Sequence, residues 1–477
     1  MNSVVVGLGK TGASCVRYLI KRGDRVSATD SRRAPPGLAE LGELAAAVDL
    51  RLGGFDQSLL EGASQVLMSP GVSLEEPIAR AARARGIEVL GDVELFARAV
   101  SAPVIGITGT NGKSTVTTLV ARMAAAAGRK VLAGGNLGEP ALDLLERPKP
   151  DLYVLELSSF QLETTASLVL QAAVVLNVTA DHLDRYPSVE AYSQAKSRIF
   201  ANASTVVLNA DDPWVMAMRD TRYRSPTART LTFSIERADA DFTLIRSGAK
   251  VFLARRGEKL LDVARMKISG MHNAANALAA LSLGEAVGLP TPAMLQALES
   301  FPGLSHRSSW VADVGGVRFI DDSKGTNVGA TIAAVRGMAG PLVVIAGGEG
   351  KGQDFTPLAE VFRAKVREAV LIGKDAPAIA AALKGVCETR SAPSMEAAVA
   401  EALRVAHAGD TVLLSPACAS FDMFRDYGHR GDVFAAAVMA LPDAAPGAAP
   451  GAAPGASPAP SVSLSEPPTV APKGAAS

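Results

Sequence analysis

The chain has 477 residues, 48% of them hydrophobic and 20% charged, which predicts about three globular domains with buried cores. Its 48 basic and 48 acidic side chains cancel, so no long-range positive field is available to attract nucleic acid or an anionic membrane. Three scattered cysteines, Cys15, Cys387 and Cys418, have no metal-ligand spacing and fit a reducing compartment. The sequence shows neither a secretion signal nor an apolar run of 18 residues, so we expect a cytoplasmic protein without membrane insertion.

Residues 1 to 98 alternate short apolar runs with helical patterns, which predicts a parallel sheet with crossover helices. The first strand, VVVG, leads into GLGKTG at residues 7–12, and Asp30 ends the next strand. This is the layout of a dinucleotide-binding turn. Because such a turn holds any anion at a helix N-terminus, a dinucleotide, another phosphate ligand and simple tight packing all remain open.

Residues 99 to 303 predict a second α/β domain, with strands in PVIGITG, KVLAGG, LYVLELSS, AAVVLNV and STVVLNA. Small antiparallel strands are expected over residues 230–270, followed by a long amphipathic helix in MHNAANALAALSLGEAVGL. The Pro302-Gly303 pair is the next break and the expected hinge.

The stretch GITGTNGKST, residues 106–115, joins a buried strand to a helix. Its ending predicts a phosphate-binding loop, in which Lys113 reaches the β- and γ-phosphates and Ser114 binds Mg²⁺. Ile107 stands where the general pattern has a glycine, five residues before Gly112. The simpler interpretation is an ordinary strand-to-helix turn with a surface lysine.

Two further strand ends carry polar residues. In ELSSFQLE, Glu156 ends a buried strand and is a candidate Mg²⁺ ligand, while Ser158 or Ser159 would cap the next helix. In NVTADHLDRY, His182 follows the next strand; a lone histidine is more often structural, but this position favours a function. Lys196, on the helix that follows, is by itself indistinguishable from a solvated surface lysine.

The boundary with the last domain adds three candidate binding residues. Asn273 and Asn276 share one helix face and would contact a base or ribose, or only cap that helix. Arg307 follows the Pro302-Gly303 break and would reach a phosphate across a cleft, although a surface ion pair is the simpler interpretation.

Residues 304 to 440 predict a third α/β domain with a parallel sheet, its strands in VRFIDDS, LVVIAGG, EAVLIG and TVLLSPA. Three polar loops, DDSKGTN, GGEGKGQDF and SPACASFDMFRDYGHRG, would meet at one sheet edge and suit a small dicarboxylate or carboxylate–amine substrate. Residues 441 to 477 are rich in Ala, Pro, Gly and Ser, and we expect them to be disordered.

Taken in order, twelve motifs resemble those of the muramyl ligases: GLGKTG, SPG, TGTNGKST, GGNLG, ELSSFQLE, NVTADHLDRY, AKSRIF, HNAANALAA, HR, DDSKGTN, GGEGKG and LLSPACASFD. The resemblance runs from residue 1 to about 440, and the ordered set is far more specific than any one motif. It implies an α/β enzyme of three domains: a Rossmann-like UDP-binding domain (1–98), a P-loop ATPase-like central domain (99–303) and a Rossmann-like amino-acid-binding domain (304–440).

The resemblance also implies a reaction. An ATP-dependent ligase of this kind adds D-glutamate to UDP-N-acetylmuramoyl-L-alanine through an acyl phosphate, giving ADP and phosphate, in peptidoglycan synthesis. Phosphorylation is needed because a carboxylate is a poor electrophile, and Mg²⁺ with Lys113 would neutralise the approaching anions. The implied partners are these two substrates and ATP with Mg²⁺, and the implied state is a monomer.

Carried over by position, the resemblance implies site residues. UDP-substrate contacts fall on Lys10, Thr11, Asp30, Ser31, Ser69, Pro70, Gly71, Asn136, Ser158 and His182. ATP contacts fall on Gly109, Thr110, Asn111, Gly112, Lys113, Ser114, Thr115, Asn273, Asn276, Arg307, Asp322 and Lys324, and D-glutamate contacts on Thr326, Lys351, Ser420, Phe421 and Tyr427.

The implied metal ligands are Ser114 and Glu156 for one Mg²⁺, and His182 and Lys196 for a second. Lys196 would be carbamylated by CO₂, which turns a cation into an anionic ligand. The implied catalytic set is Lys113, Glu156, His182, Lys196 and Lys324. The chain departs from the family pattern at Gly325, Glu349, Phe421 and Tyr427, where Ala, Asp, Leu and Phe are expected, which leaves the detail of the amino-acid pocket open.

Three alternatives remain open. GLGKTG would also serve an NAD(P)-dependent oxidoreductase, although that function leaves the later loops unexplained. A nucleotide-binding scaffold without catalysis would need a lost catalytic group, and none is missing. Within the family, a ligase for another amino acid is the nearest rival.

Overall fold

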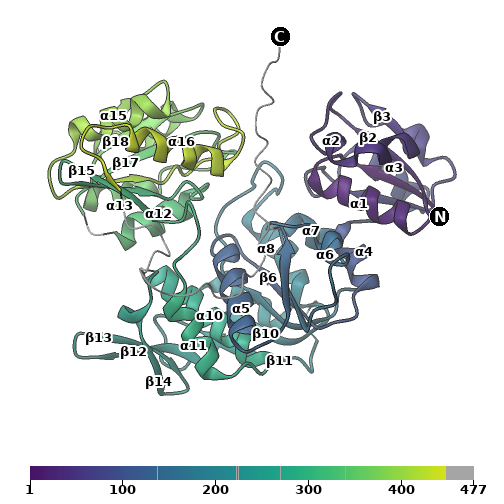
Figure 1. Cartoon of the computed structure of the whole chain (residues 1–477), viewed down its shortest axis with the longest axis horizontal. Coiled ribbons are helices and arrows are strands. Elements are labelled where there is room, and N and C mark those ends of the chain that lie inside the picture. The colour runs from purple at the N-terminus through teal and green to yellow at the C-terminus, as the bar shows by residue number, and fades with distance from the viewer. Residues whose placement is uncertain (137, 222, 224, 269, 339, 447–477) are drawn as a thin grey trace, which may run out of the picture.

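The computed structural model describes residues 1–136, 138–221, 223, 225–268, 270–338 and 340–446. Three β-sheets follow one another along the chain, each flanked by helices, so the predicted three-domain α/β class is confirmed (Figure 1). In Figure 1 the first domain (purple) and the C-terminal domain (green to yellow) lie above opposite ends of the central domain. None of the described helices is long and apolar enough to cross a membrane.

The first sheet has strand order β3-β2-β1-β4-β5 and is parallel throughout. The five predicted strands all form, and this order puts GLGKTG at the carboxyl edge of the central strand. The elements are β1 Asn2–Val6, α1 Lys10–Lys21, β2 Arg25–Asp30, α2 Gly37–Leu41, η1 Gly42–Ala47, β3 Asp49–Leu52, η2 Gln57–Leu60, β4 Gln65–Met68, α3 Pro77–Ala84, β5 Glu88–Leu90 and α4 Asp92–Ala99.

The central sheet has nine strands in the order β14-β13-β12-β11-β10-β9-β6-β8-β7. Strands β6 to β12 pair in parallel, and β13 and β14 then continue from β12 in antiparallel pairing, within residues 230–270 where antiparallel strands were expected. The strands are β6 Val104–Thr108, β7 Val131–Gly135, β8 Leu152–Glu156, β9 Leu170–Val175, β10 Ala203–Asn209, β11 Arg229–Phe233, β12 Phe242–Ser247, β13 Lys250–Arg255 and β14 Glu258–Asp262.

Two long helices, α5 Lys113–Ala126 and α10 Met271–Ala286, pack together on this sheet. Residues 276–284 of α10 are all buried, so the predicted amphipathic character was wrong: this helix is covered on nearly every side and reads as apolar all round. The remaining helices are α6 Ala141–Leu144, α7 Ser159–Glu163, α8 Val189–Ser197, η3 Arg198–Phe200, α9 Pro213–Ala217, η4 Met218–Asp220, η5 Val263–Arg265 and α11 Thr291–Ser300.

The C-terminal sheet has the order β19-β18-β17-β20-β16-β15-β21. The four predicted strands, β16, β17, β18 and β20, pair in parallel as expected, whereas β15 and β21 were not predicted and add an antiparallel edge. β15 is antiparallel to β16 because the two-residue turn Gly315-Gly316, with φ of 57° and 80°, folds them into a hairpin. The strands are β15 Ser309–Val314, β16 Val317–Asp321, β17 Leu342–Gly347, β18 Val366–Ile372, β19 Glu388–Ser391, β20 Thr411–Leu414 and β21 Ala445–Pro446.

Its helices are α12 Val328–Gly337, α13 Leu358–Lys365, α14 Ala376–Ala382, α15 Met395–Val405 and α16 Tyr427–Met439. The segment predicted to be disordered begins at residue 441, yet β21 within it pairs with β15. Residues 447–477, the rest of that segment, lie outside the described part of the chain.

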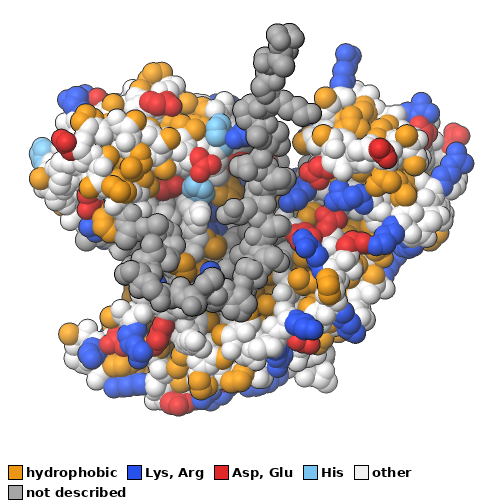
Figure 2. Space-filling model, viewed as in Figure 1, with side chains coloured by type: hydrophobic (Ala, Val, Ile, Leu, Met, Phe, Trp, Pro, Cys, Tyr) orange, Lys and Arg blue, Asp and Glu red, His pale blue; other side chains and the backbone are white. Residues whose placement is uncertain are grey.

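The domain contacts differ in kind. One apolar core runs from the first domain into the central domain and includes an edge-to-face contact between Phe96 and Tyr153, with ring centroids 5.2 Å apart. Arg17 of α1 also pairs with Asp143 of α6 at 2.8 Å. Among the described residues, the core clusters of the central and C-terminal domains stay separate. Acidic and basic side chains are interspersed over the visible face of the first two domains, which agrees with the zero net charge (Figure 2).

Candidate active site

The loop between β6 and α5 has the backbone of a phosphate-binding loop. Gly112 caps α5 with a φ of 83°, and a Cβ atom there would come within 2.4 Å of the Asn276 side chain, so only glycine fits. The helix that follows has no side-chain cap, which leaves its first N–H groups available to an anion. The glycine pattern of the sequence therefore predicted this turn correctly despite Ile107.

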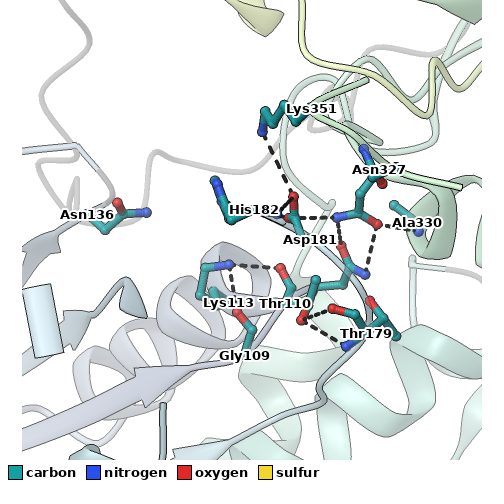
Figure 3. Close-up of polar contacts among 12 residues, drawn as sticks. Gly109, Thr110, Lys113, Asn136, Thr179, Asp181, His182, Asn327, Ala330 and Lys351 are labelled. Atoms are coloured by element: carbon teal, nitrogen blue, oxygen red, sulfur yellow. Dashed lines mark hydrogen bonds and ion pairs between the residues drawn. The ribbon is translucent and has the colours of Figure 1, made fainter. Parts of the chain in front are cut away.

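Two lysines share one carbonyl of this loop. The Lys113 ammonium donates to the carbonyls of Gly109 at 2.9 Å and Thr110 at 2.8 Å (Figure 3). The Lys196 ammonium also donates to the Gly109 carbonyl, at 3.0 Å. Lys196 is 1% exposed, so it is not the surface lysine that the helix alone suggested. Burial lowers the pKa of Lys113 and takes the pKa of Lys196 well below its usual range, and for Lys196 the neighbouring Lys113 charge adds to this effect.

Glu156, at the end of β8, is a buried residue whose carboxylate has only one of its two oxygens hydrogen-bonded among the described groups. Its Oε1 accepts a 2.6 Å hydrogen bond from Asn136, while its Oε2 is buried without a partner among the described groups. An unpartnered buried carboxylate oxygen is costly unless it meets a ligand, so it fits one corner of a Mg²⁺ site. No set of three or more His, Cys, Asp or Glu side chains in the described chain could hold a metal, so hydroxyl, modified-lysine or phosphate oxygens would have to complete the site.

His182 is held beside these groups in a left-handed conformation, with φ of 55°. Its ring lies edge-on to Phe160, with centroids 4.9 Å apart, and 6.2 Å from the ring of Tyr192. Burial lowers the pKa of His182 to about 4, so the imidazole is neutral at pH 7 and able to bind a metal. The Tyr192 ring also lies 4.3 Å from the Lys196 nitrogen, a contact that sequence analysis missed.

A cavity of 260 Å³ opens between the central and C-terminal domains, next to the phosphate loop. Its wall contains most of the residues expected to bind ATP: Asn111, Gly112, Thr115, Asn273, Asn276, Arg307, Asp322 and Lys324. Arg307 extends from the C-terminal domain to the phosphate loop and donates to the Ser114 hydroxyl at 3.3 Å. This contact favours the expected role of Arg307 at a phosphate over a surface ion pair. Sequence analysis missed the apolar part of the wall, which includes Phe233 and Leu176.

Two half-buried groups in the wall of this cavity have shifted pKa values. Burial raises the pKa of Asp322 to about 7, although its carboxylate accepts from Ser415 at 2.9 Å. Burial lowers the pKa of Lys324 to about 7, and the adjacent Arg307 charge lowers it further. The Lys324 nitrogen lies 3.6 Å from the centre of the Tyr427 ring. A phosphate beside Lys324 and Arg307 would raise the pKa of Lys324 and so favour its charged form.

A larger cavity of 710 Å³ lies where the first domain meets the central domain. It is lined by the predicted residues Lys10, Thr11, Asp30, Ser31, Ser69, Pro70, Gly71 and Asn136. Ser158 is not in this wall; its hydroxyl accepts from the Gln161 N–H and caps α7, as the simpler interpretation held. Arg185 was missed: it lines the cavity and donates to the Val72 carbonyl at 2.9 Å.

Asp30 has a structural task inside this cavity. Its carboxylate accepts from the Leu8 N–H at 2.7 Å, and from Nε and Nη2 of the Arg32 guanidinium at 2.8 and 2.7 Å. Burial acts to raise the pKa of Asp30, but these hydrogen bonds outweigh it and lower the pKa. These hydrogen bonds tie the GLGKTG loop to the end of β2. In a dinucleotide-binding domain the equivalent carboxylate binds a ribose hydroxyl, so an Asp30 carboxylate that is already bonded weakens that interpretation.

The residues expected around D-glutamate come from three loops of the C-terminal domain. Lys351 points toward the central domain, with its nitrogen 3.9 Å from Asp181 (Figure 3). Ser420 is buried, Thr326 is half-buried, and Tyr427 begins α16 beside Lys324. Phe421 is 68% exposed, so this side chain lies largely in solvent.

Comparison with known proteins gives one consistent result. The family model described as Mur ligase MurD-like, N-terminal domain matches residues 1–91, Mur ligase middle domain matches residues 107–284, and Mur ligase, glutamate ligase domain matches residues 306–418.

The chain is 54% identical over 439 residues to a UDP-N-acetylmuramoylalanine–D-glutamate ligase of Nitrosococcus oceani, covering 91% of this chain and 96% of that protein. It is 50% identical over 444 residues to the protein of the same name from Methylobacillus flagellatus, covering 92% and 96%. Among solved structures, the UDP-N-acetylmuramate-alanine ligase of Thermotoga maritima aligns with a TM-score of 0.59 at 21% identity, covering 91% of this chain and 98% of that one. This last likeness concerns the fold alone.

Proposed function

The chain belongs to the Mur ligase family, and we propose that it is the UDP-N-acetylmuramoylalanine–D-glutamate ligase of peptidoglycan precursor synthesis. The family uses ATP and Mg²⁺. The observation that carries the proposal is that Lys113, Glu156, His182 and Lys196 lie together at one edge of the central sheet. Lys351 of the C-terminal domain faces this edge beside Asp181 (Figure 3). The predicted domain boundaries, the monomeric state and the cytoplasmic location stay predictions.

The proposed first step joins the L-alanine carboxylate of the substrate to the γ-phosphate of ATP. A carboxylate oxygen attacks phosphorus, the bond to the β–γ bridging oxygen breaks, and ADP leaves. Lys113 and the free N–H groups of α5 would hold the phosphates, and Arg307 would reach them from the other domain. Bound Mg²⁺ supplies charge neutralisation between the two anions. Glu156 Oε2 and the Ser114 hydroxyl would hold one ion, and His182 with Lys196 the other.

The proposed second step forms the amide. The neutral amine of D-glutamate attacks the acyl-phosphate carbonyl, the amine proton is released, and inorganic phosphate leaves with the electrons of the C–O bond. Lys351, Thr326 and Ser420 would bind the amino acid, and Lys324 would meet the charge that develops on the phosphate. Two reacting groups on different domains must come within about 3–3.5 Å, so closure of the two domains is part of the function.

Lys196 is proposed to be carbamylated. Its amine attacks CO₂, a nitrogen–carbon bond forms, and one proton leaves. Only an unprotonated amine is a nucleophile, and burial keeps the pKa of Lys196 far below its usual range. In the described part of the chain Lys196 makes no ion pair that would stabilise its charged form.

The test is phosphate release from ATP with UDP-N-acetylmuramoyl-L-alanine, comparing D-glutamate, L-glutamate and other amino acids in CO₂-containing buffer with Mg²⁺. We expect release that depends on D-glutamate. Release with another amino acid only would keep the mechanism and refute the substrate. No release with any amino acid would refute the function.

A further inference from the structure

Four polar side chains meet where the C-terminal domain rests on the phosphate loop: Asn111, Asp181, Asn327 and Lys351, here called the junction (Figure 3). We propose that Asn327 is a positioning residue of the ligase reaction, which sets the Lys351 loop against the phosphate loop. The inference rests on the proposed function, because it assigns the coupling between the ATP side and the amino-acid side of that site.

Asn327 uses its whole side-chain amide. Its nitrogen donates to Asn111 Oδ1 at 3.2 Å and to Asp181 Oδ2 at 3.3 Å. Its oxygen accepts from Asn111 Nδ2 at 3.4 Å and from the N–H of Ala330 at 2.8 Å. An asparagine amide offers two donors and two acceptor positions, so all four are occupied. With 2% exposure, this residue has little water to replace a lost partner, and its geometry is fixed by three separate segments.

The partners on the central domain are themselves fixed. The Asn111 N–H donates to Asn177 Oδ1 at 2.8 Å, and Asn177 Nδ2 donates to the Asn111 carbonyl at 3.1 Å. Thr110 is tied to Thr179 on the same segment. The amide that Asn327 meets is therefore part of the phosphate loop and moves with it.

On the C-terminal side, Asn327 is linked to the expected D-glutamate lysine. The next residue, Val328, donates its N–H to Gln353 Oε1 at 3.0 Å, and Gln353 Nε2 donates to the Gly350 carbonyl at 2.8 Å. Lys351 follows directly and faces Asp181, the acid that Asn327 also contacts. Asn327 thus joins the two halves of the site by a short chain of hydrogen bonds.

The variant Asn327→Asp isolates this role. Aspartate caps a helix as well as asparagine does, so the hydrogen bond from Ala330 is kept. Both amide donors are lost, and a second carboxylate is placed against Asp181, which pushes the domains apart. Ser394→Asp is the matched control: Ser394 caps α15 in the same domain, away from the junction, and the change adds the same charge at a cap.

We expect Asn327→Asp to lower kcat by about 10²-fold, since a misplacement of about 1 Å costs that much. KM for D-glutamate should rise, while the dissociation constant of UDP-N-acetylmuramoyl-L-alanine stays at the wild-type value. Scattering with a non-hydrolysable ATP analogue should give a larger radius of gyration for this variant than for wild type and Ser394→Asp. The double variant Asn327→Asp with Asp181→Asn should regain compactness, because the new amide can donate to the new carboxylate.

The proposal is overturned if Asn327→Asp matches Ser394→Asp in kcat, in KM for D-glutamate and in radius of gyration. If the Asp variant shows no cooperative melting, Asn327→Ser replaces it, because serine keeps a capping oxygen and lacks the amide donors. A wild-type enzyme without D-glutamate-dependent turnover would refute the proposed function instead. The scattering comparison would then still test the junction by itself.

Discussion

Asn136 donates a 2.6 Å hydrogen bond to Oε1 of Glu156, and that contact leaves Oε2 of the same buried carboxylate without a partner among the described groups. The amide fixes the plane of the carboxylate, so the free oxygen has a defined direction. A carboxylate that gave stability alone would have both oxygens bonded. The pair therefore has the form of a metal ligand with its orienting neighbour.

Glu156→Gln should separate catalysis from stability. It removes the charge that would hold Mg²⁺, so we expect kcat/KM to fall by about 10²-fold or more. Thermal stability should stay the same or rise, because a half-satisfied buried charge is removed. The control is Glu360→Gln, whose carboxylate is exposed and pairs with Arg336. Wild-type turnover by the Glu156→Gln variant with Mg²⁺ would exclude the ligand role.

Carbamylation of Lys196 should be visible directly. Wild-type protein in ¹³C-labelled bicarbonate should give a carbamate carbon signal by NMR that Lys196→Ala lacks. Lys259→Ala, a change at an exposed lysine, should keep it. Activity should fall in CO₂-free buffer and return with bicarbonate. Full activity without CO₂ and no labelled carbon would show that the lysine stays unmodified.

Lys351→Met should weaken D-glutamate binding without changing the binding of UDP-N-acetylmuramoyl-L-alanine. A charge-assisted hydrogen bond contributes about 1.5–3 kcal/mol, so KM for D-glutamate should rise by about 10- to 150-fold. Binding of UDP-N-acetylmuramoyl-L-alanine, measured by calorimetry, should not change, because its cavity lies between the other two domains. Lys384→Met, at an exposed position of the same domain, is the control. An unchanged KM for D-glutamate would remove Lys351 from that pocket.

His306→Gln should change how stability depends on pH. The His306 ring bonds Asp321 at 2.7 Å, with Asp432 at 3.6 Å, and the Asp321 hydrogen bond raises the pKa of His306. A raised folded-state pKa gives stability that is complete below the unfolded value of about 6.5 and is lost as pH rises through the folded value.

The wild type should therefore exceed His306→Gln by about 1.5–3 kcal/mol in free energy of unfolding near pH 5.5, and the gap should shrink toward pH 9. Chemical denaturation across this range is the measurement. His407→Gln, at an exposed histidine of the same domain, is the control. A gap that stays constant with pH would mean that the histidine contributes only packing.

Much of the site could be predicted because it lies at strand ends. A strand followed by a polar loop is a local pattern, and the parallel sheet brings such loops to one edge. Lys113, Glu156 and His182 were found in this way. The Gly315-Gly316 hairpin also had a local signal, two glycines between alternating strands, which was overlooked.

Other residues could not be predicted from local pattern. Lys196 is buried because its helix packs against a loop that lies 87 positions away in the chain. Asn327 stands 216 positions from Asn111 and 146 from Asp181. Their partners are fixed only by the way the domains dock, and no spacing in the sequence reports that docking.

The two domain contacts of the central domain also differ in what their separation would expose to water. Parting the first domain would hydrate the apolar core around Phe96 and Tyr153, and such exposure carries a large positive heat-capacity change. Parting the C-terminal domain mainly hydrates amides, a carboxylate and an ammonium group, which changes the heat capacity little. The enthalpy of opening on the amino-acid side should therefore vary little with temperature, so that a van't Hoff plot of this equilibrium is close to linear, whereas one for the first domain would be curved.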